Sequence, residues 1–488
     1  MTTSTSNTTW RDRLKLFVTL NDSRFEDLER HNWKTTVYRD FSAGLIVALT
    51  AIPMAMGFAM AMGLRPEQGI IAGALACIIG RTFGGSKYQV YWPTAAFIPI
   101  IAALIFKYGP QNGGSQAEAH GFLVLVSIFA GVVLMILGVA GLGRYAKLVP
   151  NSIIVGFTVG IAVAIALTNF EDILGVESLR DMWGQDEDIK GGLLHNLYVA
   201  FGNLDKINPW SVAIGLGTFV LTRGLLKISI FIPAPLLAIG LATLVTATLL
   251  PDSGIILVRD IYGSIPNNFF VFTAPHLPAL NTTVIIDILY FTAAIVFVSG
   301  VESLLCSSMA DRLAKNKRTP FNADKEFWGQ GLVQIITPLV NGFPCTGALA
   351  RTATSIKAGA VTPLAGYFKG VLKLIMAFYM APYLEIVPMA CIGGILLWVA
   401  SNMIKPAEIR EVKATGRFEM AMLVYTAVMV PLTDFLTGVL SAMILYFVAV
   451  KLFPQLVRVT KAAVAEPIEQ PALRQVNVNA DQQNVRND

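Results

Sequence analysis

The sequence is poor in charged residues, cysteine and histidine. Asp, Glu, Lys and Arg make up only 14% of its 488 residues, against about 25% in soluble domains. The four cysteines and four histidines show no metal-ligand spacing, and the run from Gly84 to Lys87 lacks the full spacing of a phosphate-binding loop. These scarcities argue against a metalloenzyme, against a fold held by disulfides, and against a pump driven by nucleotide hydrolysis.

Long hydrophobic segments are what the sequence has in abundance. Hydrophobic residues make up 54% of the chain and the mean hydropathy is +0.60. A membrane-spanning helix needs about 20 mostly apolar residues, and about fourteen segments, some of them short or interrupted, fit that role between polar breaks. The sequence therefore predicts an all-α polytopic membrane protein embedded in the lipid bilayer.

Basic residues predict which side of the membrane each loop occupies. Lys and Arg are concentrated in the N-terminal segment, after Ala310 and after Met403, whereas acidic residues dominate the segment from Glu171 to Pro209. Since Lys and Arg in short loops stay on the cytoplasmic side, we expect both termini to be cytoplasmic, in the inner (plasma) membrane. The net charge of +5 is explained by this topology, so no nucleic-acid partner is expected.

Two hydrophobic segments are interrupted in a similar way. Residues 89–96 and residues 344–352 each place a Pro or Gly and then small residues before a short apolar run. In transporters built from inverted repeats, a pair of such interruptions marks half-helices whose N-termini meet near the middle of the bilayer. The pattern therefore predicts two positive helix ends that face one anion.

The first turn of each half-helix supplies the chemistry of an anion site. Its backbone N–H groups have no partner within the helix and carry partial positive charge, and Pro93 suits a first turn because it has no N–H to satisfy. The alternative is that the small residues serve only close helix packing. The residues expected to offer N–H groups are Thr94, Ala95, Ala96, Gly347 and Ala348.

Two charged residues are expected at membrane depth. Arg351 follows the second interruption, and Glu302 lies in a strongly apolar helix. Ionisable groups in the membrane normally face a cavity or a partner and mark function. Arg351 is expected to attract the anion and Glu302 to couple transport to a cation, with a purely structural Glu302–Arg351 pair as the alternative.

Several motifs together resemble the SulP family of sulfate-permease-type anion transporters. The first-helix signature, the third-helix pattern Gln-Val-Tyr-Trp-Pro-Thr-Ala-Ala, an eighth-helix motif and the region around the tenth helix occur in the family's order, within a stretch from about Arg39 to Phe453. The matching runs are Ile52–Ala59, Gly63–Gly69, Gln89–Ala96, Val301–Leu305, Gly347–Thr352 and Thr362–Gly366.

The resemblance implies a fold and a set of site residues. It implies two inverted repeats of seven helices, arranged as a core domain and a gate domain, with the third and tenth helices as half-helices around the anion. Met54 and Phe58 match first-helix positions that line the family's pocket. Glu302 matches an eighth-helix acid that takes part in cation or proton coupling in some members.

The resemblance also suggests domain boundaries. We expect residues 1–38 to be a cytoplasmic N-terminal segment and residues 39–453 to be the transporter domain. Residues 454–488 are too polar to order themselves and are expected to be a disordered cytoplasmic tail in place of the family's STAS domain. Without that domain, whether the chain forms a homodimer stays open.

The anion itself is less clearly indicated. Tyr91 and Trp92 replace the family's usual Ser-Gly, and Ala348 and Ala350 stand where many members have hydroxyl residues. Because a dianion needs many donors to replace its water, the loss of hydroxyls favours a smaller anion, whereas the family default is sulfate. Arg351 and two helix ends still suit sulfate.

The sequence thus predicts a secondary transporter of inorganic anions, with sulfate first and Na⁺ or H⁺ as the coupling ion. A bicarbonate/sodium symporter of the same family and an uncoupled channel or exchanger remain as alternatives. A nucleobase symporter of the same fold and a structural membrane protein fit the motifs less well.

Overall fold

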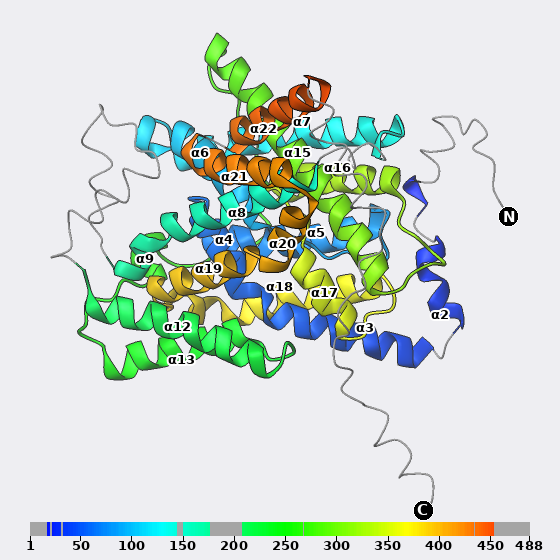
Figure 1. Cartoon of the computed structure of the whole chain (residues 1–488). Coiled ribbons are helices and arrows are strands. Elements are labelled where there is room, and N and C mark those ends of the chain that lie inside the picture. Colours follow the sequence, from blue (N-terminus) through cyan, green and yellow to red (C-terminus); the bar gives the residue numbers. More distant parts are fainter. Residues whose placement is uncertain are drawn as a thin grey trace, which may run out of the picture.

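The computed structural model describes residues 17–19, 22–30, 33–143, 150–175, 207–266, 268–433 and 435–452. Helices account for nearly all of its regular structure (Figure 1). Much of the predicted acidic outside loop, the start of the chain and the predicted tail after residue 453 lie outside the described residues.

One group of helices comes from equivalent parts of the two halves of the chain and forms the core domain. From the first half it contains α3 (Trp33–Leu49), α4 (Ala51–Ala61), α5 (Pro66–Phe83), the 3-10 turn η2 (Ala95–Phe97), α6 (Ile98–Tyr108) and α7 (Gln116–Val139). From the second half it contains α15 (Thr282–Leu313), α16 (Ala323–Leu339), α17 (Leu349–Lys357) and α18 (Leu364–Glu385).

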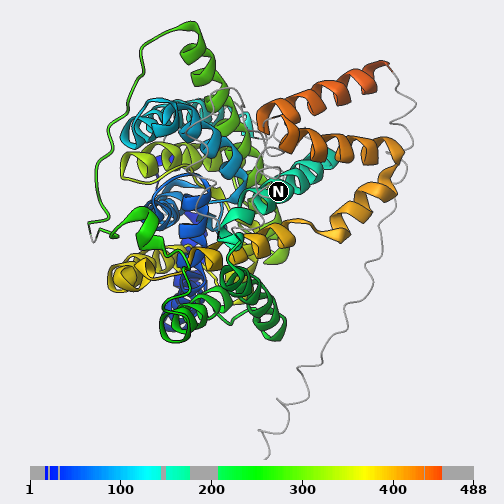
Figure 2. The ribbon, with the colours of Figure 1, turned by 90° about the vertical axis from the view of Figure 1, so that its left-hand side faces the viewer.

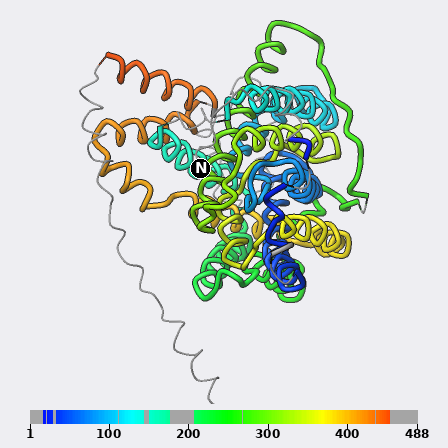
Figure 3. The backbone as a smooth tube through the Cα atoms, turned by 90° about the vertical axis from the view of Figure 1, so that its right-hand side faces the viewer, coloured from blue at the N-terminus to red at the C-terminus, as the bar shows by residue number. Residues whose placement is uncertain are grey.

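The remaining long helices form the gate domain. Figures 2 and 3 show α20, α21 and α22 gathered with α8 on one side of the molecule. The gate helices are α8 (Asn151–Thr168), α9 (Phe170–Leu174), α12 (Pro209–Ile228), α13 (Ala234–Leu249), α19 (Met389–Met403), α20 (Pro406–Thr415), α21 (Arg417–Leu432) and α22 (Phe435–Leu452). Short elements at the periphery are η1 (Ser23–Phe25), α2 (Glu26–Arg30), η3 (Pro110–Asn112) and α14 (Val258–Tyr262).

The helix contacts reveal an internal repeat. Helix α7 packs on α16, as its counterpart α18 packs on α5; helix α8 packs on α21, as its counterpart α19 packs on α12. The pairs α12–α13 and α21–α22 also correspond. The two halves therefore make the same set of contacts, as the predicted repeats of seven helices require, and the predicted division into core and gate is confirmed.

Few of these helices are simple, straight spans. Six helices of the described chain are long and apolar enough to cross a membrane by themselves, and α3 and α4 together make a seventh span that is bent by 43°. The bend follows from Pro53 in the first turn of α4, because its ring cannot donate a helical hydrogen bond back into α3. The half-helices α6 and α17 are shorter still, with 11 and 9 residues.

The chain before α3 is attached to the core domain. The Arg24 guanidinium donates to the carbonyl groups at the end of α5, including Arg81 O at 3.1 Å and Thr82 O at 3.2 Å. Asp22 accepts from Lys325 Nζ at 2.7 Å. Burial raises the pKa of the Asp22 carboxyl, but its contacts with Arg24 and Lys325 outweigh burial and hold the pKa below its ordinary value. This segment therefore joins α5 to α16 through charged groups.

A buried carboxylate on α16 holds the loop between α5 and the first interruption. Glu326 is fully buried, and each of its oxygens accepts several hydrogen bonds, which is how a buried charge is made tolerable. The donors are Gly85 N at 2.9 Å, Ser86 N at 3.1 Å, Gln89 Nε2 at 2.7 Å, Tyr91 OH at 2.7 Å and Ser303 Oγ at 2.6 Å. The loop thus enters the membrane interior in a fixed position.

Candidate functional site

The two interrupted segments pair with each other through their backbones. Strand β1 (Tyr91–Trp92) lies antiparallel to β2 (Thr346–Gly347), with Tyr91 opposite Gly347 and Trp92 opposite Thr346. Ala348 N donates to Val90 O at 2.9 Å, which extends the pairing by one step. Residues from opposite halves of the chain, 254 positions apart for the pair Trp92 and Thr346, therefore satisfy one another's backbone groups inside the protein.

This pairing determines where the half-helices begin. The chain leaves β1 through Pro93 into Thr94, the N-cap of η2, and leaves β2 into Ala348, the N-cap of α17. Because the strands are antiparallel, the two helices depart from opposite ends of the short ladder and present their N-termini on either side of it. The pairing therefore keeps the beginnings of η2 and α17 next to the same ladder.

One of the expected N–H donors is already used. Ala348 donates its N–H to Val90 O, so this group is engaged in the backbone pairing instead of being available for an anion. The next N–H groups of α17 belong to Leu349 and Ala350, within the first turn of the helix, where N–H groups have no intrahelical partner. Thr94, Ala95 and Ala96 occupy the corresponding start of η2.

Gly347 is needed for a steric reason. A Cβ atom at this position would lie 2.8 Å from Cys306 Cβ and 2.7 Å from Gln89 Cδ, both tighter than real contacts of this kind. Gln89 is itself held by Glu326 and Ser303, so it cannot easily yield. Gly347 therefore lets β2 approach α15 closely enough to pair with β1.

Arg351 lies against Trp92, which departs from the family pattern, and against Met54 of α4. Its guanidinium carbon is 4.0 Å from the centre of the Trp92 ring, and Nη2 donates to Met54 Sδ at 3.0 Å. The side chain is almost fully buried. Met54 thus contributes a weak sulfur acceptor and leaves the positive charge of Arg351 without a negative partner.

The structural pairing of Arg351 with Glu302, considered as an alternative above, is not formed. Among the ion pairs of the described residues, none includes either side chain. Glu302 lies instead near Thr94, at the start of the other half-helix. Its Oε2 atom is buried without a hydrogen-bond partner among the described residues, and the Thr94 hydroxyl is the polar group that interacts with the carboxyl, so Glu302 adjoins the site from the α15 side.

Phe58 and Met54 both lie on α4 but differ in what they contact. Met54 touches Arg351, whereas Phe58 is 4% exposed and belongs to the main hydrophobic core. The structure therefore brings Met54 directly to the charged site and gives Phe58 a position in the packing of the same helix.

Two lysines that the sequence reasoning missed complete the site. Lys369 and Lys373 lie one turn apart on α18 and are 1% and 0% exposed. Their Nζ atoms are 4.4 Å and 3.7 Å from the centre of the same Trp92 ring. Three cationic side chains thus converge on one indole, and we call Arg351, Lys369 and Lys373 the cation cluster.

The positive charge of the cation cluster is not balanced by an acidic side chain among the described ion pairs. None of the described ion pairs includes Lys369 or Lys373. Like charges held near one ring repel one another, whereas a desolvated cation–π contact stabilises each of them by about 2 kcal/mol or more. A bound anion is the component that would balance this charge.

Donors with few acceptors surround the same place. Among the described residues, Trp92 Nε1 is buried without a hydrogen-bond partner, Thr94 Oγ1 faces the Glu302 carboxyl, and Lys369 Nζ faces the weakly accepting Cys77 thiol. A buried donor without a partner is uncommon and needs an explanation. Donors, helix ends and cations in one place make this the candidate anion site.

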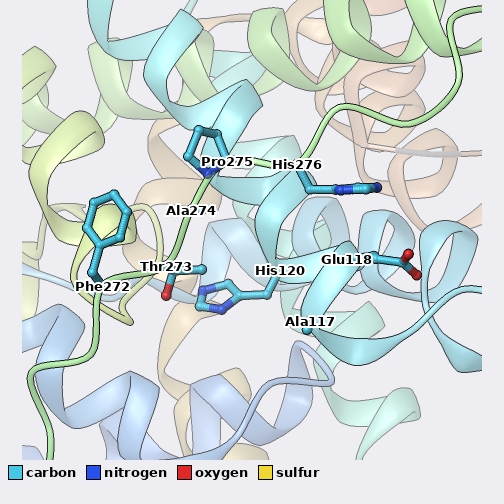
Figure 4. A pocket seen from close by; sticks show the side chains of 8 residues that line it. All are labelled: Ala117, Glu118, His120, Phe272, Thr273, Ala274, Pro275 and His276. Carbon is cyan, nitrogen blue, oxygen red and sulfur yellow. The ribbon is translucent and has the colours of Figure 1, made fainter.

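A separate cavity of about 460 Å³ lies at the beginning of α7 and is lined by that helix and by residues 272–276 (Figure 4). His120 lies here, buried on α7, where it accepts from Gln68 Nε2 at 2.9 Å and donates to Gly342 O at 2.9 Å. Among the described residues, no cluster of His, Cys, Asp and Glu is arranged to hold a metal.

The fold defines the class of protein, an all-α multi-pass membrane protein, and the cation cluster marks the candidate anion site beside its half-helices. Sequence comparison agrees, because the model of the sulfate permease family matches residues 37–426. The chain belongs to the sulfate permease family. It is a membrane transport protein for inorganic anions.

Two bacterial relatives illustrate the range of the family. The chain is 34% identical over 412 residues to "Putative sulfate transporter YvdB" of Bacillus subtilis. This alignment covers 84% of the chain and 73% of the relative. It is 28% identical over 370 residues to the bicarbonate transporter BicA of Picosynechococcus, covering 75% of this chain and 61% of BicA. The chain thus spans less than two thirds of BicA.

Solved structures share the fold at lower identity. The transmembrane domain of a cyanobacterial BicA matches with a TM-score of 0.68 and 22% identity, over 83% of this chain and 97% of that domain. Murine Slc26a9 in its inward-facing state matches with a TM-score of 0.77 and 15% identity, over 93% of this chain and 73% of the other. Both confirm the architecture.

Gly73 on α5 provides a test of the cation cluster. A Cβ atom here would clash with Lys373 Nζ and lie 3.0 Å from the Trp92 ring. We expect Gly73→Ala to displace the Lys373 ammonium group and to reduce anion uptake into proteoliposomes strongly while the protein still folds. The matched control is Gly240→Ala on α13, where an added Cβ meets nothing within 4 Å; equal uptake by both variants would contradict the assigned position of Lys373.

Proposed function

We propose that the protein is a secondary transporter that moves sulfate across the cytoplasmic membrane by alternating access. The observation that supports this most is the meeting of the two half-helices at a buried Arg351 that has no acidic partner. The anion binds where the helix ends, Thr94 and Arg351 converge. Movement of the core domain against the gate domain then exposes this place to each side in turn.

Sulfate is the first candidate because YvdB is named for sulfate and the family takes its name from sulfate permeases. Bicarbonate is the second, because BicA is similar in sequence and in fold. Uptake of each radiolabelled anion into proteoliposomes, with and without an inward Na⁺ or H⁺ gradient, separates them. Uptake of neither anion would refute the proposal, and uptake without any gradient dependence would favour a channel or exchanger.

The coupling ion is proposed to act at Glu302. Its unpartnered Oε2 atom lies beside Thr94 at the start of η2, so a proton or Na⁺ bound there would offset the carboxylate charge next to the anion. Binding of the cation and the anion would then favour each other, which is the physical requirement for symport. The cytoplasmic placement of both termini is part of the same proposal.

Removal of the Arg351 charge is expected to abolish transport. Truncating one partner of a buried charge contact costs about 2–5 kcal/mol, so Arg351→Ala should lower the uptake rate at subsaturating anion roughly 100-fold. Arg351→Lys should retain part of the rate because it keeps the charge. Arg410→Ala, on the exposed helix α20, serves as the control, and normal uptake by Arg351→Ala would refute the half-helix site.

Neutralising Glu302 is expected to uncouple transport from the cation. Glu302→Gln keeps the size of the side chain but can no longer bind and release a charge, so we expect uptake that no longer responds to the driving gradient. The control is Glu411→Gln on the surface of α20. An unchanged gradient dependence in the Glu302 variant would assign that residue a structural role.

A further inference from the structure

Lys369 and Lys373 belong to α18, outside the two half-helices and outside the motifs that identified the family. Both lie on the Trp92 ring that also contacts Arg351. Among the described residues, Lys369 Nζ interacts with the thiol of Cys77, a weak acceptor, and Lys373 Nζ has the Gly69 carbonyl at 3.5 Å, the limit of a hydrogen bond. Neither buried ammonium group has an acidic partner in the described ion pairs.

Ordinary packing does not account for these lysines. At a buried position of a helix inside a membrane protein, Leu or Met costs less free energy than Lys. A buried ammonium group loses its hydration, and only pairing with an acceptor or an opposite charge compensates that loss. The neighbouring helix also makes room for the amine specifically, since Gly73 lies against Lys373 Nζ and any Cβ there would displace it. The space is shaped around the charged end of the side chain.

The charge of the cluster matches a particular kind of anion. One monovalent anion beside Arg351 would leave the two lysines uncompensated. A divalent oxyanion has a second charge and additional oxygens, so it can accept from Arg351 and the helix ends and also from the lysine ammonium groups. Trp92 Nε1, which is buried and unpartnered, supplies a further donor at the same ring.

We propose that Lys369, Lys373 and Trp92 form a subsite that selects divalent oxyanions of the sulfate type over monovalent anions. This inference rests on the proposed function of the Arg351 site and identifies its substrate class. These residues stand in for the hydroxyl donors that this chain lacks relative to its family, with Lys369 and Lys373 contributed by α18 and Trp92 by β1.

Binding to the purified full-length protein in detergent tests the subsite. Affinities for sodium sulfate, sodium bicarbonate and sodium chloride are measured by isothermal titration calorimetry at one ionic strength, adjusted with gluconate. The main variant is Lys369→Met combined with Lys373→Met, because Met has a similar length and no charge. Lys413→Met on the exposed helix α20 is the control, and thermal melting reports whether each variant folds.

The expected result is a roughly 100-fold loss of sulfate affinity in the double variant, as for two lost contacts to charged groups, with little change in bicarbonate or chloride affinity. Trp92→Phe, which keeps an aromatic ring and removes the N–H donor, should also weaken sulfate binding selectively. If the double variant does not fold, the single Lys369→Met variant, which removes one of the two ammonium groups, decides the same question.

Three results would overturn the inference: unchanged sulfate affinity in the folded lysine variants, an equal loss for all three anions, or a preference of the unaltered protein for a monovalent anion. Arg351→Ala distinguishes these failures from failure of the proposed function. Loss of all anion binding in that variant supports the Arg351 site whatever the lysine variants do, and full retention refutes that site.

Discussion

The pairing of Tyr91–Trp92 with Thr346–Gly347 is the interaction on which the rest of the structure depends. Irregular backbone at membrane depth is tolerated only where its N–H and C=O groups find partners within the protein, and here each interruption provides them for the other. The pairing positions both half-helices, brings Trp92 to Arg351 and leaves first-turn N–H groups unpaired. Buried polar side chains hold both strands in place. Glu326 accepts from the Tyr91 hydroxyl in β1, and Gln334 donates to Cys345 O at 2.7 Å just before β2.

Glu326 and the cation cluster, both buried in the core domain, differ in how many partners surround their charges. Glu326 is surrounded by donors and has a structural role, because every neighbouring group contributes to its stability. The cation cluster is surrounded by an indole ring, a thioether and one distant carbonyl group. A buried charge whose hydrogen-bond partners are all present stabilises the fold. A buried charge without an opposite charge favours the binding of a ligand that carries one.

The sequence carried enough information to predict the half-helices but not how they meet. A Pro or Gly before small residues is a local signal, whereas the register of Trp92 with Thr346 depends on residues far apart in the chain. That register explains why the Ala348 N–H is used in pairing and why Arg351 lies against Trp92 instead of Glu302. Lys369 and Lys373 did carry a signal, two lysines spaced one turn apart in an apolar helix, and charges at membrane depth are rare enough to mark a site.

The central claim is that an anion binds between the beginnings of η2 and α17, in contact with the cation cluster. A high-resolution structure of the full chain in lipid nanodiscs with selenate, an electron-rich stand-in for sulfate, would test it most directly. The account predicts selenate density bounded by Thr94, Arg351 and the Lys369 and Lys373 ammonium groups. Density only elsewhere, for example in the cavity beside His120, or an anion-free site with the cations in mutual contact at saturating selenate, would contradict it.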